Sequence, residues 1–268
     1  SSDALAIYSD GGAHCFAAGC NHHVNGGNMI TQITEAAPVK ACRLSMGGTV
    51  AAIPQRRLSQ ETCSHFGVTV EYSTTGEIIK HYYPYYKIDT NEVGSAKVRE
   101  VKTKNFHTTG DVTGVGFFGQ NRCTSSRYLT ITEGELDALA VFEMSGRKWD
   151  VVSLRSGAAN AAKEIKEQLE WIEGYEQVVL CFDNDKAGDA AVDQVKDIFS
   201  PNKLKIVKLP LKDASDMLMA NKVKEFTQAW WNAKIYRPDG IVAGVDTWEA
   251  LVEKRKVKST PYPWEGLN

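Results

Sequence analysis

The middle of the chain alternates between strand-like and helix-like patterns. Tyr128 to Thr132 is typical of a strand, and Gln177 to Phe182 is the nearly unbroken apolar run of a strand buried on both faces. Leu136 to Met144 carries apolar residues at helical spacing. Trp149 to Leu154 predicts a third strand, followed by a second helix from Asn160 to Glu170. This alternation predicts an α/β unit in which helices flank a parallel sheet.

A different pattern precedes this unit. Ser59 and Gly67 bracket a short predicted helix as its cap and its stop. Val68 to Lys87 is aromatic and alternating, with a turn at Thr74-Thr75-Gly76, and predicts a β-hairpin. We interpret its tyrosines as half-buried sheet residues, with base stacking as the alternative. The polar, small residues from Val24 to Lys40 predict a linker.

Two further helices are predicted near the end of the chain. Lys222 to Trp231 reads as a closing helix, and Tyr236 to Gly240 breaks it. Another helix starts at Asp246, has one apolar face and leads into the basic run Lys254 to Lys258. A short amphipathic helix needs cover for its apolar face. We therefore expect it to pack on a neighbouring subunit or on a further domain.

Composition narrows the classes of protein to which the chain can belong. Its 268 residues suffice for one large or two modest domains, and the net charge of −2 requires any nucleic-acid surface to come from local clustering. No apolar run approaches the length of a membrane span, and the first residues lack the pattern of a signal peptide. The six cysteines are scattered, as reduced cytosolic thiols are. We expect a soluble enzyme with no membrane partner.

Acidic residues follow the predicted strands at three separated points. Glu133 follows the first strand, Asp183 and Asp185 follow the apolar run, and Asp213 comes about thirty residues later with Asp216 beside it. A parallel sheet would bring these carboxylates to one edge, where open α/β sheets bind ligands. Helix capping is the alternative for a single Asp, but one helix needs only one cap. Carboxylates gathered in this way favour Mg²⁺ or Mn²⁺ over zinc.

The spacing of these acids resembles the TOPRIM domain of primases and of type IA and II topoisomerases. The resemblance covers roughly Arg127 to Asp216 and rests on the motifs TEGELDAL, CFDNDKAG and KDASD. It implies that Glu133, Asp183, Asp185 and Asp213 are catalytic and that they hold two Mg²⁺ or Mn²⁺ ions with Asp216. The turn from Arg155 to Asn160 could hold a phosphate, and Lys186 and Lys212 are interpreted as salt-bridge partners of the acids, with phosphate contact as the alternative.

A basic segment upstream extends the resemblance. Lys97, Arg99, Lys102 and Lys104 lie within eight residues, and strand alternation places the first two on one side. With the Gly-rich stretch that follows, the segment resembles the basic motif of the primase half of phage bifunctional primase-helicases. In that family, which is related to the mitochondrial replicative helicase Twinkle, the motif faces nucleotide phosphates and template. Topoisomerases lack it.

The first residues resemble the second half of the zinc ribbon that precedes such primases. Cys15 and Cys20 lie near His14, His22 and His23, after a predicted hairpin turn at Asp10-Gly11-Gly12. A ribbon site needs two Cys pairs, and only one is visible. Zinc is therefore expected to be lost or incompletely held in this chain.

The resemblance divides the chain into six parts. A partial zinc-ribbon remnant and a linker come first, then a smaller α+β subdomain, the TOPRIM subdomain, a closing helix, and a linker whose helix resembles the one that joins primase-helicase subunits into a ring. Their expected bounds are 1–23, 24–40, 41–126, 127–216, 217–236 and 237–268. The final PYPWEGLN resembles the start of a helicase domain, although no G-x₄-G-K-[ST] loop occurs in the sequence.

The expected function is DNA-templated synthesis of short RNA primers on single-stranded DNA from ribonucleoside triphosphates. The resemblance implies a fused or adjacent helicase, a homo-oligomeric ring and a replicative DNA polymerase as partners, in the cytoplasm of an infected bacterial host. A TOPRIM nuclease would use the same acids with water as the nucleophile. A non-catalytic TOPRIM adaptor of a replication complex is the second alternative.

Overall fold

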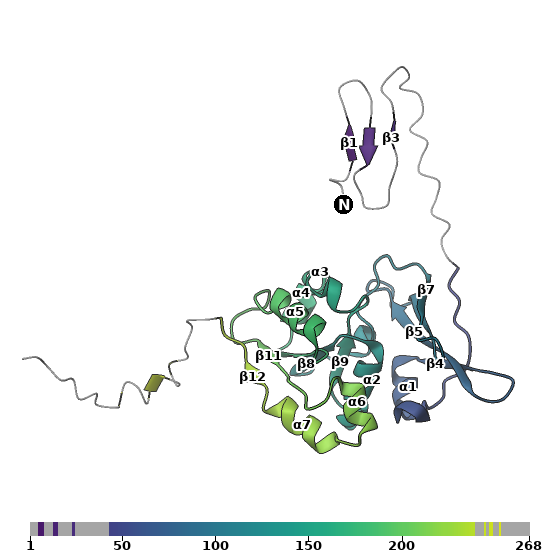
Figure 1. Cartoon of the computed structure of the whole chain (residues 1–268). Coiled ribbons are helices and arrows are strands. Elements are labelled where there is room, and N and C mark those ends of the chain that lie inside the picture. Colours follow the sequence, from purple (N-terminus) through teal and green to yellow (C-terminus); the bar gives the residue numbers. More distant parts are fainter. Residues whose placement is uncertain are drawn as a thin grey trace, which may run out of the picture. The chain divides into compact units, whose positions relative to one another are not determined.

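The computed structural model describes residues 43–238, the strand segments 5–7, 13–15 and 23–24, and residues 244, 247, 248 and 252. The chain divides into two compact units, Ser1–Ala41 and Cys42–Asn268. In the first, β1 (Leu5–Ile7), β2 (Ala13–Cys15) and β3 (His23–Val24) form an antiparallel sheet (Figure 1). The pairing of β1 with β2 confirms the predicted hairpin. The side chains of the predicted zinc ligands and most of the helix predicted from Asp246 lie outside the described residues.

The second unit begins with an antiparallel sheet. Its strands are β4 (Thr69–Tyr72), β5 (Ile78–Tyr86), β6 (Val93–Glu100) and β7 (Phe106–Gly110), paired in sequence order. The helix α1 (Gln60–Phe66) comes before it, starting where Ser59 Oγ accepts from the Thr62 N–H and ending at Gly67, whose φ of 72° favours glycine. The predicted helix and hairpin are both confirmed.

The tyrosines of β5 are more deeply buried than the alternating pattern suggests. Tyr82, Tyr83 and Tyr85 are 6%, 0% and 3% exposed. The rings of Tyr83 and Tyr85 contact Phe118, so one face of the strand packs against the rest of the unit. The base-stacking alternative is therefore wrong for these three tyrosines, because their ring faces are covered by protein.

The second sheet is parallel except at one edge. Its order is β12-β11-β10-β8-β9, and only β12 (Lys234–Ile235) runs antiparallel to its neighbour. The other strands are β8 (Tyr128–Thr132), β9 (Asp150–Ser153), β10 (Gln177–Cys181) and β11 (Leu204–Ile206). This sheet confirms the predicted α/β class. The chain leaves β8 toward β9 on one side and returns to β10 on the other, so the topological switch point lies between β8 and β10.

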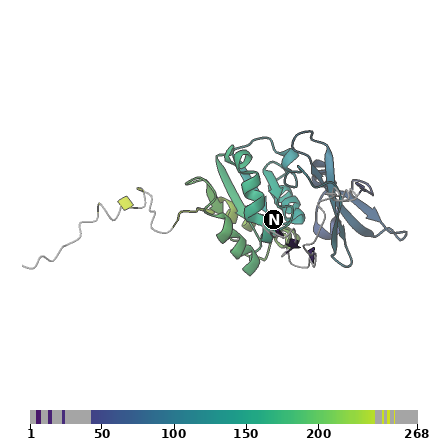
Figure 2. The ribbon, with the colours of Figure 1, turned by 90° about the horizontal axis from the view of Figure 1, so that it is seen from above.

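Helices cover both faces of this sheet (Figures 1 and 2). One face packs against α2 (Glu135–Met144), α6 (Ala214–Met219) and α7 (Val223–Trp231), and the other against α3 (Ala161–Glu167), α4 (Leu169–Glu173) and α5 (Lys186–Val195). Neighbouring residues of β10 accordingly point to opposite cores, which explains its unbroken apolar run.

The single helix predicted from Asn160 to Glu170 is wrong. Gln168, with φ −112° and ψ 13°, leaves the helical region and separates α3 from α4. Its side chain accepts a hydrogen bond from the Gln120 Nε2 at 3.0 Å, and the turn lets Ile172 reach the same buried core as Ile165. The sequence predicted one helix because the apolar spacing continues across Gln168 without a visible break.

The antiparallel sheet and the parallel sheet share one core. Phe66 of α1 packs on Phe118 and Phe142, with ring centroids 5.2 and 5.1 Å apart, and all three belong to the cluster that α2 covers. The second unit is therefore a single packed body in which β5 and β6 are held against the start of α2. Over the described parts of the chain, no helix has the length and apolarity that crossing a membrane requires.

We predict that Trp230→Phe destabilises the second unit by roughly 2–3 kcal/mol. Trp230 is 1% exposed, and its Nε1 donates to the buried Thr130 Oγ1 at 3.0 Å, so phenylalanine leaves both a cavity and an unpaired hydroxyl. Trp231→Phe is the matched control, because that side chain is 50% exposed. Urea unfolding of the two variants should separate them clearly. Equal losses would contradict the proposed importance of the Trp230 hydrogen bond.

Candidate active site

The sheet register brings two of the predicted acids to one place. Thr132 and Cys181 are paired residues at the ends of β8 and β10, so Glu133 and Asp183 leave the sheet side by side at the switch point. Asp213 immediately precedes α6, which packs against α2. The parallel pairing thus places Glu133 and Asp183 at one edge of the sheet, as the sequence predicted, because neighbouring parallel strands end at the same edge.

Glu133 lacks a partner for one of its oxygens. Its Oε2 is buried without a hydrogen bond in the described part of the chain. Burial raises the pKa of Glu133, and the negative charges of Asp183 and Asp185 raise it further, while the backbone N–H groups of Ala158 and Asp183 act in the opposite direction. An unpaired buried carboxylate oxygen costs stability unless a cation completes its surroundings.

The turn that follows β9 lies against Glu133. Gly157 has φ 72° and ψ −168°, a conformation that is essentially reserved for glycine, and a Cβ there would lie 3.8 Å from Glu133 Oε1. The N–H groups of Arg155 and Ser156 are bound by the Glu164 carboxylate at 2.6 and 2.9 Å. The phosphate-binding interpretation of this turn is therefore wrong for those two amides, because Glu164 already occupies them. The turn instead supports Glu133.

Asp183 and Asp185 share a cation within the chain. Lys212 Nζ lies 3.2 Å from Asp183 Oδ2 and 3.6 Å from Asp185 Oδ2. The bond to Asp183 raises the pKa of Lys212, and the salt-bridge interpretation of this lysine is confirmed. Asp185 also caps α5, since its Oδ1 accepts from the Ala187 and Gly188 N–H groups at 3.0 and 3.1 Å. These bonds, the one from Gly188 first, lower its pKa.

Asp213 caps α6 and is also repelled by neighbouring carboxylates. Its Oδ1 accepts from the Asp216 N–H at 2.6 Å and caps α6. Burial raises the pKa of Asp213, and the charges of Asp216 and Asp183 add to this effect. Asp185 and Asp213 therefore both cap helices, as the capping alternative predicted. The charge of Asp185 also acts on Glu133, and the charge of Asp183 acts on Asp213.

Asp137 belongs to the same group, and the sequence analysis missed it. It lies in the first turn of α2, where its Oδ1 accepts from the Ser215 N–H at 3.0 Å. Burial raises its pKa well above the ordinary value, and the charges of Asp213, Asp183 and Glu133 contribute. The sequence did contain a signal for it. Asp137 lies four residues after Glu133, and on a helix residues four apart lie on the same face.

The chemistry of this group fits a divalent cation. Within the described ranges, no three ligand-type side chains already form a set that could hold an ion. The acids are nevertheless mutually repulsive, one oxygen is unpaired, and Lys212 supplies positive charge between two of them. Hard carboxylate oxygens in such surroundings suit Mg²⁺ or Mn²⁺.

The predicted basic residues separate into two pairs. Lys97 and Arg99 lie on one side of β6, with Lys97 Nζ and the Arg99 guanidinium 5.5 and 5.8 Å from the centre of the Phe106 ring. Lys97 forms an ion pair with Glu135 at the start of α2, while Arg99 is only 6% exposed. Lys102 and Lys104 lie in the exposed turn between β6 and β7. Lys97 is thus paired with Glu135, a residue that lies two positions after Glu133 in the sequence.

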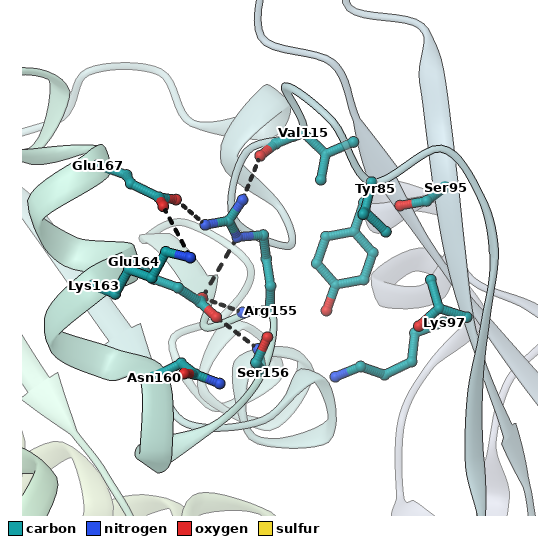
Figure 3. Close-up of a pocket in the computed structure, with 12 residues that line it drawn as sticks. Tyr85, Ser95, Lys97, Val115, Arg155, Ser156, Asn160, Lys163, Glu164 and Glu167 are labelled. Carbon is teal, nitrogen blue, oxygen red and sulfur yellow. Dashed lines mark hydrogen bonds and ion pairs between the residues drawn. The ribbon is translucent and has the colours of Figure 1, made fainter. Parts of the chain in front are cut away.

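A pocket of about 310 Å³ opens between β6 and α3 (Figure 3). Such a volume lies at the lower end of the range for small-molecule sites. Ser156 in its wall precedes Gly157, the residue that lies against Glu133, so the pocket adjoins the carboxylate group. Its wall is formed by Tyr85, Ser95, Lys97, Thr108, Val112, Val115, Arg155, Ser156, Asn160, Lys163, Glu164 and Glu167.

Comparisons with known proteins agree with this geometry. Residues 130–218 match a family model described as Toprim-like. The chain is 30% identical over 265 residues to a DNA helicase/primase of Enterobacteria phage T3, a match that covers 94% of this chain and 45% of that protein. The chain therefore spans less than half the length of this curated relative.

Two solved structures are also similar. The primase fragment of the bacteriophage T7 primase-helicase is 28% identical, with a TM-score of 0.66, over 86% of this chain and 95% of that one. The second is a bacteriophage T7 structure of lagging-strand DNA polymerase interacting with primase domains bound to an RNA/DNA hybrid and dTTP. Its matched chain is 32% identical, with a TM-score of 0.64, over 70% of this chain and 94% of that one.

We predict that Glu133→Gln stabilises the metal-free protein at neutral pH, by about 2–4 °C in Tm for a change of ~1 kcal/mol. A carboxyl with a raised pKa costs stability when ionised, so the gain should shrink as the pH falls to the ordinary value of 4.5 and below. The check is thermal unfolding with a chelator present.

Glu143→Gln is the matched control for this prediction. Burial acts to raise the pKa of Glu143, but hydrogen bonds from Ser59 and Thr62 and the charge of Arg147 outweigh it and lower the pKa. This substitution should therefore destabilise the protein at neutral pH. A loss of stability in Glu133→Gln would show that Glu133 is a structural residue.

We also predict that Lys212→Gln tightens Mn²⁺ binding in the absence of nucleotide by about two- to fivefold, the scale of an exposed ion pair. The ammonium occupies the space between Asp183 and Asp185 that a divalent ion would share. Lys208→Gln, which removes an exposed pair with Asp189, should leave binding unchanged. Isothermal titration with Mn²⁺ alone measures both, and weaker binding by Lys212→Gln would contradict the competition.

Proposed function

Because the chain belongs to the family of phage DNA primase-helicases and matches their primase part, we propose that it synthesises short RNA primers on single-stranded DNA. The observation that carries the proposal is the group of coupled carboxylates at the switch point between β8 and β10. The pocket beside that group, with Lys97 in its wall, adds the space that a nucleotide substrate requires.

The proposed reaction is nucleotidyl transfer. The 3′-hydroxyl of the primer attacks the α-phosphate of an incoming ribonucleoside triphosphate, the new phosphodiester bond forms, and pyrophosphate leaves. Glu133, Asp183, Asp185 and Asp213 would hold two Mg²⁺ or Mn²⁺ ions, with Asp216 and Asp137 beside them. Such ions, when bound, stabilise the attacking and leaving oxygens of an in-line displacement.

Glu133 is the proposed acceptor of the hydroxyl proton. Burial first, and then the charges of Asp183 and Asp185, raise its pKa, and a carboxylate with a raised pKa is a better proton acceptor. Its Oε2 has no partner within the described residues and is free to accept. The turn at Gly157 lies against the same side chain, since a Cβ at that position would be 3.8 Å from Glu133 Oε1.

The basic residues would neutralise the substrate. Lys97 lines the pocket and is proposed to approach the triphosphate, where a fixed cation stabilises negative charge that develops as pyrophosphate leaves. Arg99 is buried beside Phe106 and would act by supporting the position of Lys97. Lys102 and Lys104, in the exposed turn, are proposed to contact the phosphates of the template.

We extend the proposal to the wider assembly. We propose a fused or adjacent helicase domain, a homo-oligomeric ring and a replicative DNA polymerase as partners, in the cytoplasm of the infected host. The sequence-based domain bounds remain our proposal for how this part is organised. Of the predicted ring-forming helix, Thr247, Trp248 and Val252 are described in helical conformation, and Trp248 is 66% exposed, as an unoccupied contact residue would be.

Incubation with labelled ATP and CTP, Mg²⁺ and mixed single-stranded DNA tests the proposal directly. We predict that the parent protein forms short RNA products and that Asp183→Asn reduces joining by at least about a hundredfold, because the amide keeps the shape but loses the charge that holds a metal ion. Asp193→Asn, on the exposed side of α5, is the control. Circular dichroism should show both variants folded.

Other outcomes of this assay would overturn the proposal. Cleavage of the DNA without nucleotide joining would indicate a TOPRIM nuclease. Binding of DNA without either reaction would indicate an adaptor. Parent-like extension of a preformed dinucleotide by Asp183→Asn would remove that residue from the metal site.

A further inference from the structure

The Lys97 ammonium is held by a carboxylate that is almost completely buried. Glu135, the first residue of α2, is 4% exposed, whereas the Lys97 side chain keeps 19% of its surface and lines the pocket. Removing one partner of a buried ion pair leaves an uncompensated charge, which costs more stability than the pair itself contributes. Lys97 can therefore move toward a substrate only if another group stabilises the charge of Glu135.

Tyr85 supplies this second contact. Its hydroxyl donates to Glu135 Oε1, the same oxygen that pairs with Lys97. Over residues 43–238, no other side chain forms a hydrogen bond or ion pair with this carboxylate. Burial, and after it the charge of Glu135, raise the pKa of Tyr85 well above its ordinary value, so the hydroxyl stays protonated and remains a donor.

The antiparallel sheet places Tyr85 and Lys97 on the same face. Tyr83 lies directly opposite Lys97 in the pairing of β5 with β6, and Tyr85 lies two residues further along β5. Figure 3 shows the Tyr85 ring and the Lys97 side chain on one wall of the pocket, and Lys97 Nζ is 6.0 Å from the centre of that ring. The ring is 3% exposed and packs on Phe118, whereas the lysine can turn about its four-carbon stem. Glu135 thus has one fixed partner and one flexible partner.

We propose that Tyr85 is a positioning residue that controls how readily Lys97 leaves Glu135 for the substrate. Without nucleotide, Lys97 stays paired with Glu135. When a triphosphate binds, the ammonium moves to the phosphates, and the Tyr85 hydroxyl keeps the buried carboxylate hydrogen-bonded. The inference rests on the proposed function, since it needs a triphosphate within reach of Lys97. It adds an exchange of partners at a buried glutamate, which keeps the cation paired until the substrate arrives.

Isothermal titration with ATP and Mg²⁺, without template, tests the exchange. Tyr85→Phe should weaken ATP binding about three- to tenfold, the scale of one hydrogen bond, because Glu135 then depends on Lys97 alone and holds it more tightly. Tyr82→Phe is the matched control, since it removes a buried β5 hydroxyl that donates to Glu71 and lies on the other face of the strand. This control should change ATP binding by less than about twofold.

Steady-state primer synthesis gives a second measurement of the same effect. Tyr85→Phe should raise the KM for ATP by the factor found in the titration and should change kcat by less than about twofold, because Lys97 is engaged in both proteins once ATP is saturating. A substitution that only disturbed the fold would not be confined to KM.

A double-mutant cycle shows whether the Tyr85 hydroxyl acts through Glu135. Glu135→Gln removes the charge that Lys97 has to leave, so Tyr85→Phe should no longer weaken ATP binding in that background. Circular dichroism identifies any variant that does not fold. Lys97→Gln provides a second background, in which Tyr85→Phe should again have no further effect because no ammonium remains to be released.

The outcomes separate this inference from the proposed function. Unchanged ATP binding in Tyr85→Phe would overturn the exchange, and so would an equal loss with and without Glu135→Gln. A fall in kcat at constant KM would overturn it as well, since the hydroxyl would then act in the reaction step. Primer synthesis by the parent would leave the primase assignment standing in each case. Absence of primer synthesis in the parent would reject the proposed function itself, whatever the binding cycle shows.

Discussion

The register between β8 and β10 is the constraint on which the rest of the site depends. Because Thr132 pairs with Cys181, the two strands end level, and the acids that follow them cannot separate without breaking the sheet. Burial first, and the charges of neighbouring acids after it, raise the pKa values of Glu133, Asp137 and Asp213. The fold maintains this arrangement because buried cores on both faces of the sheet supply far more stability than the acids remove.

The antiparallel sheet is connected to the group of carboxylates through the buried side chain of Glu135. Glu135, 4% exposed, accepts from the Tyr85 hydroxyl and pairs with Lys97, so β5 and β6 are tied to the first residue of α2. Glu133 lies two residues earlier. Any shift of the antiparallel sheet would therefore reach the carboxylates through Glu135. A buried pair of this kind contributes more to specific positioning than to net stability.

Most of the fold and part of the site could be predicted from the sequence. The strands β8, β9 and β10 and the helix α2 follow from apolar patterns, and Ser59 and Gly67 mark the ends of α1 through local chemistry. The acids at Glu133, Asp183 and Asp213 follow from the rule for parallel strand ends. Asp137 was missed because it lies inside a helix, where an acid reads as a solvated residue. The break at Gln168 and the use of the turn amides by Glu164 depend on tertiary contacts that no local pattern encodes.

The two carboxylate oxygens of Asp185 make different contacts. Oδ1 caps α5, and Oδ2 faces Lys212, so a cation can be exchanged at one oxygen without uncapping the helix. The capping bonds also keep this carboxylate ionised at a pH where Glu133 takes up protons more readily. The cluster is thus graded in acidity, with the pKa of Asp185 lowered and the pKa of Glu133 raised from their ordinary values. A single sheet edge therefore carries carboxylates of different acidity, distinguished only by what each one touches.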